Sequence, residues 1–187
     1  MKLKITKFKS VKSTNDEAIK LIRSGKLNQG LVSTELQTNG RGTMGKKWSS
    51  EKGNIFISIF FKVNFSKIKI QNFLIISAKI VKEALKQYTQ KKITIKKPND
   101  LLIENKKISG ILQEVIVIKN ENFLITGIGI NTFIAPNNKK IISTCLKNHT
   151  NKTLRNLIII KNIKNAYEKI INEFENNNFT NIKNRYI

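Results

Sequence analysis

The sequence predicts an α+β fold in which helices flank a mixed or antiparallel central sheet. Hydrophobic residues make up 40% of the chain, which is typical of a globular protein. With 187 residues the chain is long enough to bury a core. The predicted elements run strand, helix, strand, strand and helix, followed by several short strands and a final helix. Because neither an internal repeat nor a linker divides the chain, we expect one domain over residues 1–187.

The N-terminal half predicts two helices separated by strands. The segment Ser13-Thr14-Asn15 precedes an apolar stripe, so we expect a helix that Thr14 and Glu17 open with a capping box and Gly25 ends. Alternating or continuous apolar residues predict strands over residues 4–11, 30–35 and 54–63. Residues 36–50 are polar and rich in glycine, which predicts a loop, and residues 71–89 have the pattern of an amphipathic helix.

The C-terminal half predicts four short strands and a long helix. The strands are expected over residues 92–96, 101–104, 108–118 and 123–130, with hairpin turns at 105–106 and 120–122. A helix is predicted over residues 153–176, with Thr153 as its cap.

Cysteine and histidine are too scarce for several kinds of site. Cys145 is the single cysteine, which excludes an intramolecular disulfide, and a cysteine-based zinc site lacks ligands. We therefore predict no metal site made by a cluster of protein side chains alone. Cys145 and His149 are either a nucleophilic pair or, as the sequence favours, a buried thiol and a surface imidazole.

The net charge of +23 allows two interpretations. Lysine is spread along the whole chain together with isoleucine and asparagine, which indicates a compositional background that also attracts ATP and an acidic protein substrate. The alternative is a basic nucleic-acid-binding module, but the sequence contains none of its usual signatures, so we expect no nucleic acid partner. An apolar run of membrane-spanning length and a secretory signal are also missing, so we expect a cytoplasmic protein without a membrane partner.

The glycine-rich loop at residues 37–48 is the first candidate site. Its glycines let the backbone approach a ligand closely, and its cations Arg41, Lys46 and Lys47 suit phosphate. Without a ligand such a loop is expected to be mobile. Taken alone, the loop is better explained as a solvated connection between strands.

Two further segments complete the candidate site. Pro98 separates two strands, so Asn99 and Asp100 can project together toward a ribose or Mg²⁺, although an Asx-turn is the simpler explanation. The segment from Gly127 to Asn131 places glycines within an apolar strand, which indicates that another group packs closely against the backbone.

In this order the motifs resemble the catalytic domain of biotin–protein ligases. The resemblance covers about residues 8–175 and is carried by a set of short segments. They are Ser13-Thr14-Asn15, Gln37, Gly40-Arg41-Gly42, Trp48, Gly53-Asn54-Ile55-Phe56, Pro98-Asn99-Asp100, Lys106-Lys107, Gly110-Ile111-Leu112-Gln113-Glu114 and Gly127-Ile128-Gly129-Ile130-Asn131.

The resemblance implies a fold like that of class II aminoacyl-tRNA synthetases and biotin ligases. It also implies an ATP-dependent ligase that forms a carbon–nitrogen bond. Biotin would be activated as biotinyl-5'-AMP with the help of Mg²⁺ and transferred to a lysine of the biotin carboxyl carrier protein, a subunit of acetyl-CoA carboxylase. Since members of the family form dimers through sheet edges, a homodimer is compatible with the resemblance.

The resemblance also implies roles for individual residues. The catalytic residues would be Arg41, Lys107 and Asn99. Biotin would be bound by Ser13, Thr14, Asn15, Gln37, Gly40, Arg41, Lys107 and Gly110. ATP would be bound by Arg41, Lys46, Trp48, Asn99, Asp100, Lys107, Gly129 and Asn131.

The sequence departs from the family pattern in several places. Thr43 stands where the family often has arginine, which Lys47 would compensate, and Lys97 replaces a tryptophan. We also expect neither the N-terminal DNA-binding segment nor the C-terminal SH3-like domain, and therefore no repressor role. These departures keep two other hypotheses open: a degenerate ligase that binds biotin without catalysis, and a lipoate or octanoate ligase or transferase of the same fold.

Overall fold

A seven-stranded sheet forms the centre of the described part of the chain, in the order β1-β2-β3-β7-β6-β5-β4. The computed structural model describes residues 2–65, 69–137, 141–176 and 178–186. Strands β1 and β2 pair in parallel, and the other neighbours pair antiparallel, so the sheet is mixed. The strands are β1 (Ile5–Val11), β2 (Gly30–Gln37), β3 (Ile55–Lys62), β4 (Ile93–Lys96), β5 (Asp100–Ile103), β6 (Lys106–Ile118) and β7 (Glu121–Ile130).

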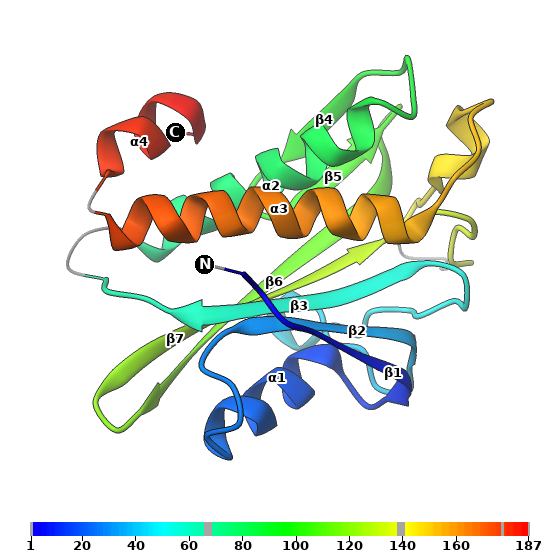
Figure 1. Ribbon diagram of the computed structural model, residues 1–187. Helices are drawn as coiled ribbons and strands as arrows, with labels where there is room; N and C mark the ends of the chain where they lie inside the picture. Colours follow the sequence, from blue (N-terminus) through cyan, green and yellow to red (C-terminus); the bar gives the residue numbers. More distant parts are fainter. Residues whose placement is uncertain (1, 66–68, 138–140, 177, 187) are drawn as a thin grey trace.

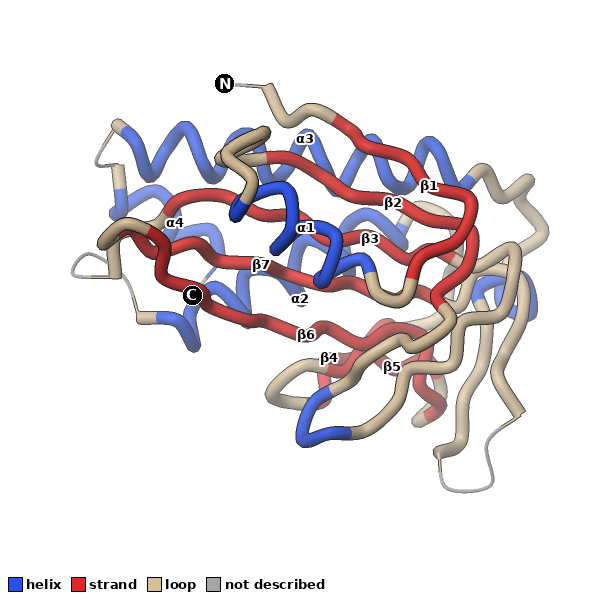
Figure 2. The backbone as a smooth tube through the Cα atoms, turned by 90° about the horizontal axis from the view of Figure 1, so that it is seen from below, coloured by secondary structure: helices blue, strands red, loops and turns tan. Residues whose placement is uncertain are grey.

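Helices cover both faces of this sheet, which confirms the predicted fold class. Helices α2 (Ile70–Lys86), α3 (Asn156–Glu175) and α4 (Phe179–Tyr186) lie on one face, and α1 (Thr14–Arg23) lies on the other (Figure 1). In Figure 2, α1 lies in front of the sheet while α2 and α3 lie behind it. In the described ranges, none of the helices is both long and apolar enough to cross a bilayer.

The two faces bury cores of different size. The face under α2 and α3 buries a large cluster that includes Ile57, Phe61 and Phe73, whereas α1 covers a small cluster around Ala18 and Phe60. Strand β3 contributes to both clusters, and for this reason all its residues except Lys62 are buried. Since α1 covers only part of its face, the same face has room for a ligand pocket beside the helix.

Several local predictions were wrong in detail. Helix α1 begins after Ser13, and Glu17 pairs with Lys20 at 2.7 Å instead of closing a capping box with Thr14. The cap of α3 is Arg155 rather than Thr153, and helix α4 was not predicted. Residues 104–105 and 119–120, each one position earlier than expected, have the positive φ angles of the two hairpin turns.

The structure also argues against a nucleophilic pair of Cys145 and His149. Cys145 is buried and free, as the second interpretation expected. The ring of His149 is half-buried, and its Nε2 lies 2.8 Å from Thr144 Oγ1. With the imidazole engaged by a threonine hydroxyl, the geometry supports a structural role for both residues.

A buried hydroxyl pair joins α2 to α3 and yields a stability prediction. The Tyr167 hydroxyl donates to Ser77 Oγ at 2.7 Å, and burial raises the pKa of this phenol, so it stays a donor. Tyr167→Phe removes that bond and should lower the free energy of unfolding by about 1 kcal/mol in urea titration.

Tyr88→Phe is the matched control, because Tyr88 is 8% exposed and its hydroxyl has no hydrogen bond to another described residue. We expect a change within about 0.5 kcal/mol for the control. Equal effects of the two substitutions would show that the Tyr167–Ser77 bond contributes nothing specific.

Candidate functional site

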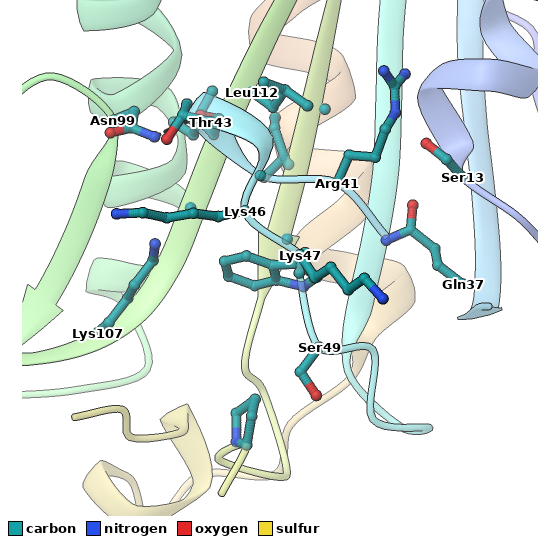
Figure 3. Close-up of a pocket in the computed structure, with 18 of the residues that line it drawn as sticks. Ser13, Gln37, Arg41, Thr43, Lys46, Lys47, Ser49, Asn99, Lys107 and Leu112 are labelled. Carbon is teal, nitrogen blue, oxygen red and sulfur yellow. Dashed lines mark hydrogen bonds between the residues drawn. The ribbon is translucent and has the colours of Figure 1, made fainter. Parts of the chain in front are cut away.

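A pocket opens on the α1 face of the sheet, between the start of α1, the glycine-rich loop and strands β6 and β7 (Figure 3). It brings together segments as far apart in the chain as those that hold Ser13 and Ser143. Of the residues expected at the site, Ser13, Thr14, Asn15, Gln37, Arg41, Lys46, Trp48, Asn99, Lys107, Gly110, Gly129 and Asn131 line the pocket.

Two expected site residues lie behind the pocket wall. The Gly40 carbonyl accepts a hydrogen bond from the Trp48 N–H at 2.9 Å, so Gly40 closes the base of the loop. The Asp100 carboxylate forms an ion pair with Lys107 Nζ at 2.7 Å. In this structure both residues therefore position a pocket residue and do not face the cavity themselves.

Gln37 organises the polar end of the pocket. Its Oε1 accepts hydrogen bonds from the Thr14 N–H at 2.9 Å and the Thr14 hydroxyl at 3.1 Å. Gln37 Oε1 thus accepts from the first N–H group of α1, which has no partner within the helix. The result is a rigid cluster of buried hydroxyls and amides at the helix start, suited to a ligand with its own donors and acceptors.

The glycine-rich loop folds back on itself as a small hairpin. Besides the bond between Trp48 and Gly40, the Gly42 N–H donates to the Lys46 carbonyl at 2.6 Å. The backbones of Arg41 and Lys47 also form an isolated antiparallel β-bridge. The tip is a short 3-10 turn, Thr43–Gly45, in which Met44 is 93% exposed. Nothing in the described chain covers this tip, so other contacts must hold the loop against the sheet.

The indole of Trp48 lies directly on the backbone of β6 and β7. Gly110 and Gly129 are cross-strand partners in that sheet. A methyl group added to either glycine would lie 2.6 Å from an indole carbon, far inside van der Waals contact. Gly127 similarly makes room for Asn15, so the glycines of β7 accommodate two side chains, as the sequence suggested.

The pocket carries more positive than negative charge. Lys107 is paired with Asp100, and its Nζ lies 5.3 Å from the centroid of the Trp48 ring. Lys46 and Lys47 have no ion pair with any described residue, so their charges are available to an anion. Figure 3 shows that Lys46 and Lys107 extend toward the same side of the pocket, while Arg41 points away from them.

Three polar atoms of the pocket residues are buried without a hydrogen-bond partner in the described chain. They are Arg41 Nε, Trp48 Nε1 and Asn131 Oδ1. A buried polar atom without a partner costs about 1–3 kcal/mol, so native proteins usually satisfy such atoms with water or a ligand. All three residues line the cavity, so the unpartnered atoms suit a polar ligand.

Sequence reasoning missed the residues that support the pocket. Ser58 is fully buried on β3, where its hydroxyl donates to Asn15 Oδ1 and lies 2.7 Å from Thr14 Oγ1. A serine inside an apolar strand was the available signal. Pro136, Ile141 and Ser143 also line the pocket, although no local sequence pattern indicated this.

A cation-rich pocket lined by glycines, on one face of a mixed sheet, is the arrangement of a protein class whose site suits an anionic small molecule. The chain belongs to the Biotin/lipoate A/B protein ligase family, whose sequence model matches residues 7–131. It is 30% identical over 177 residues to the bifunctional ligase/repressor BirA of Bacillus subtilis, covering 91% of this chain and 54% of that protein. The Escherichia coli BirA is 31% identical over 114 residues, covering 59% of this chain and 36% of that protein. The chain thus spans about half the length, or less, of these curated relatives.

Solved structures agree with this assignment. The biotin protein ligase from Aquifex aeolicus in complex with biotin and ATP superposes with a TM-score of 0.75 at 28% identity, covering 91% of this chain and 71% of that chain. The Leishmania major biotin protein ligase in complex with biotinyl-5-AMP gives a TM-score of 0.73 at 23% identity, covering 92% of this chain and 80% of that chain. The fold is therefore that of the biotin protein ligases, as the resemblance in sequence implied.

The close contact between Trp48 and the sheet can be tested by fluorescence, because Trp48 is the single tryptophan. Gly129→Ala should push the indole outward, shift its emission to the red and lower the free energy of unfolding by about 1–3 kcal/mol. In a Trp48→Ala background the same glycine substitution should cost much less stability.

Val117→Ala is the control, since Val117 is 65% exposed and lies toward the far end of β6. It should leave the emission unchanged. An unshifted spectrum for Gly129→Ala would mean that the indole does not lie on β7.

Proposed function

We propose that this protein is an ATP-dependent biotin–protein ligase that forms biotinyl-5'-AMP and transfers biotin to a lysine of a biotin carboxyl carrier protein. One observation carries the proposal: Lys46 and Lys107 extend toward the same side of a pocket whose opposite end is a cluster of polar side chains. Such a pocket can hold a carboxylate and a phosphate together and still recognise an uncharged ring. The family and the similar proteins support the same activity.

The first half-reaction needs cations more than a nucleophile. A carboxylate oxygen of biotin attacks the α-phosphorus of ATP, the bond to the β-phosphate breaks, and pyrophosphate leaves. Both reactants are anions, so positive groups fixed in place lower the barrier by opposing charge as the two approach. Lys107 is the group best placed for this task, because Asp100 holds its chain and Trp48 lies beside it.

The polar end of the pocket is proposed to recognise biotin. Buried Ser13, Thr14 and Asn15, with the amide of Gln37, provide hydroxyl and amide groups of the kind that would bind a ureido ring. Gly110 also lines the pocket, and its missing side chain lets Trp48 pack on β6 beside the proposed biotin site. The ring would bind near α1, with its carboxylate directed toward Lys107.

The nucleotide is proposed to bind at the lysine-rich end. Trp48, Gly129 and Asn131 would border the adenosine, where Trp48 Nε1 and Asn131 Oδ1 still need partners. Since the described residues include no cluster of three or more acidic, histidine or cysteine side chains, Mg²⁺ would be held mainly by ATP phosphates and water. Asn99 is its proposed protein ligand through Oδ1, because its Nδ2 donates to the Ile111 carbonyl at 3.0 Å. Bound there, Mg²⁺ would neutralise phosphate charge.

In the second half-reaction the carrier's lysine amine attacks the carbonyl carbon of the mixed anhydride. The amide C–N bond forms, the bond to the phosphate oxygen breaks, AMP leaves and the amine loses a proton. The proposed location is the cytoplasm, where ATP and the carrier would meet the enzyme.

The direct test is ATP- and Mg²⁺-dependent incorporation of labelled biotin into a purified biotin carrier domain. Lys107→Ala should lower the rate about a hundredfold or more, because it removes a positive group from the reacting anions. Lys106→Ala is the matched control, since its exposed side chain precedes Lys107 on β6 and does not line the pocket.

Wild-type protein that transfers lipoate or octanoate but no biotin would replace this proposal with the other branch of the family. Biotin binding without incorporation would indicate a degenerate ligase. Salt-sensitive binding of nucleic acid, with neither acyl transfer nor biotin binding, would support a basic nucleic-acid-binding module.

Lys47 is proposed to replace the cation that the family often has at the position of Thr43, since both residues line the pocket. Lys47→Ala should slow adenylate formation about tenfold by removing a phosphate contact. Thr43→Arg in that background should restore most of the rate. A rate unaffected by Lys47→Ala would remove Lys47 from the nucleotide site.

A further inference from the structure

The guanidinium of Arg41 is bound by two carboxylates outside the loop. Its two terminal nitrogens donate to Glu114 at 2.9 and 2.8 Å, which is a bidentate pair, and Nη2 also donates to Asp16 at 2.7 Å. Glu114 lies on β6, and Asp16 lies in the first turn of α1. One side chain of the glycine-rich loop is therefore tied to both elements that flank the pocket.

The same carboxylate is connected to the polar end of the pocket. Asn15 Nδ2 donates to Glu114 Oε2 at 2.6 Å, and Asn15 Oδ1 accepts a hydrogen bond from Ser58. The Ser58 hydroxyl also lies 2.7 Å from Thr14 Oγ1. A continuous chain of hydrogen bonds thus runs from the biotin end of the pocket to the base of the loop.

Arg41 differs from the pocket lysines in the number of carboxylates that surround its charge. Its one positive charge faces two negative charges, those of Asp16 and Glu114, so little of it remains for a phosphate. Figure 3 shows Arg41 directed away from Lys46 and Lys107. The pairs are partly open to water, since the side chains of Arg41, Asp16 and Glu114 are 36%, 37% and 25% exposed, so the contact can be broken.

We propose that Glu114 and Asp16 form a clasp that holds the glycine-rich loop over the pocket through Arg41, which makes all three positioning residues. The role of the clasp in retaining substrate rests on the proposed ligase function. Its role in holding the loop does not. The loop needs such a tether because its exposed tip at Met44 has no cover. The clasp also connects the loop to the residues proposed to bind biotin.

The test is hydrogen exchange measured by mass spectrometry on the full chain without any ligand. Glu114→Gln should speed exchange of the amides in residues 40–48 about tenfold, as expected when a bidentate charged pair is weakened. Amides of α2 and α3 should exchange at unchanged rates, which shows that the fold is intact. Glu121→Gln is the control, because Glu121 lies at the start of β7, far from the loop, and its ion pair is with Lys62 at the end of β3.

A double-mutant cycle assigns the effect to Arg41. Arg41→Ala, which removes the pairs with both carboxylates, should speed loop exchange at least as much as Glu114→Gln, and the double variant should exchange no faster than Arg41→Ala. Asp16→Asn, which removes one bond, should give a smaller increase of about threefold and keeps the test open should Glu114→Gln fail to fold. Unchanged loop exchange in these variants, or additive effects, would overturn the clasp.

Ligand retention distinguishes the clasp from the proposed function. In an active wild-type enzyme, Glu114→Gln should speed the release of the bound adenylate about tenfold while leaving pyrophosphate formation within about threefold. If Glu114→Gln instead lowered the rate of pyrophosphate formation as much as it shortened the retention of the adenylate, Arg41 would contact the reacting phosphate. If Glu114→Gln speeds loop exchange although the wild-type protein makes no adenylate, the clasp is supported and the ligase proposal is refuted.

Discussion

The indole of Trp48 lies on the backbone of β6 and β7, and the geometry of the pocket follows from that contact. Gly110 and Gly129 face each other across the two strands, and only the absence of their side chains lets the ring come so close. The contact fixes the end of the glycine-rich loop, places an unpartnered N–H beside the cavity and sets the ring 5.3 Å from Lys107. A side chain at either glycine would lift the loop and open the pocket to water.

Around this contact the described residues hold positive charges in fixed positions, and neither the cysteine nor the histidine is placed as a nucleophile. Cys145 is buried away from the pocket lining, and His149 is engaged by Thr144. The cationic groups have unequal surroundings: Lys107 is held by one carboxylate, Arg41 by two, and Lys46 and Lys47 by none in the described chain. Joining a carboxylate to a phosphate requires this kind of arrangement, in which fixed positive charge opposes repulsion between anions.

The sequence revealed the fold class and most of the pocket, because both depend on local patterns and on short motifs. The glycines of β7 correctly indicated close packing, although the sequence alone could not show that Asn15 and Trp48 were the groups packed there. The capping box was wrong because Gln37, 23 residues from Thr14, supplies the acceptor at the helix start. Ser58 and Asp16 were missed for the same reason, since their roles arise from contacts between distant segments. The same holds for Pro136, Ile141 and Ser143. Arg41 was expected to face the ligand, and only the folded chain places Glu114 and Asp16 at its guanidinium.

The central claim is that one pocket joins biotin to AMP. The most direct measurement is native mass spectrometry of the purified chain after incubation with biotin, ATP and Mg²⁺, with no carrier protein present. We predict one biotinyl-5'-AMP retained per pocket and an equal amount of pyrophosphate in solution. A folded chain that binds biotin and ATP, yet yields neither the adenylate nor pyrophosphate, would contradict it.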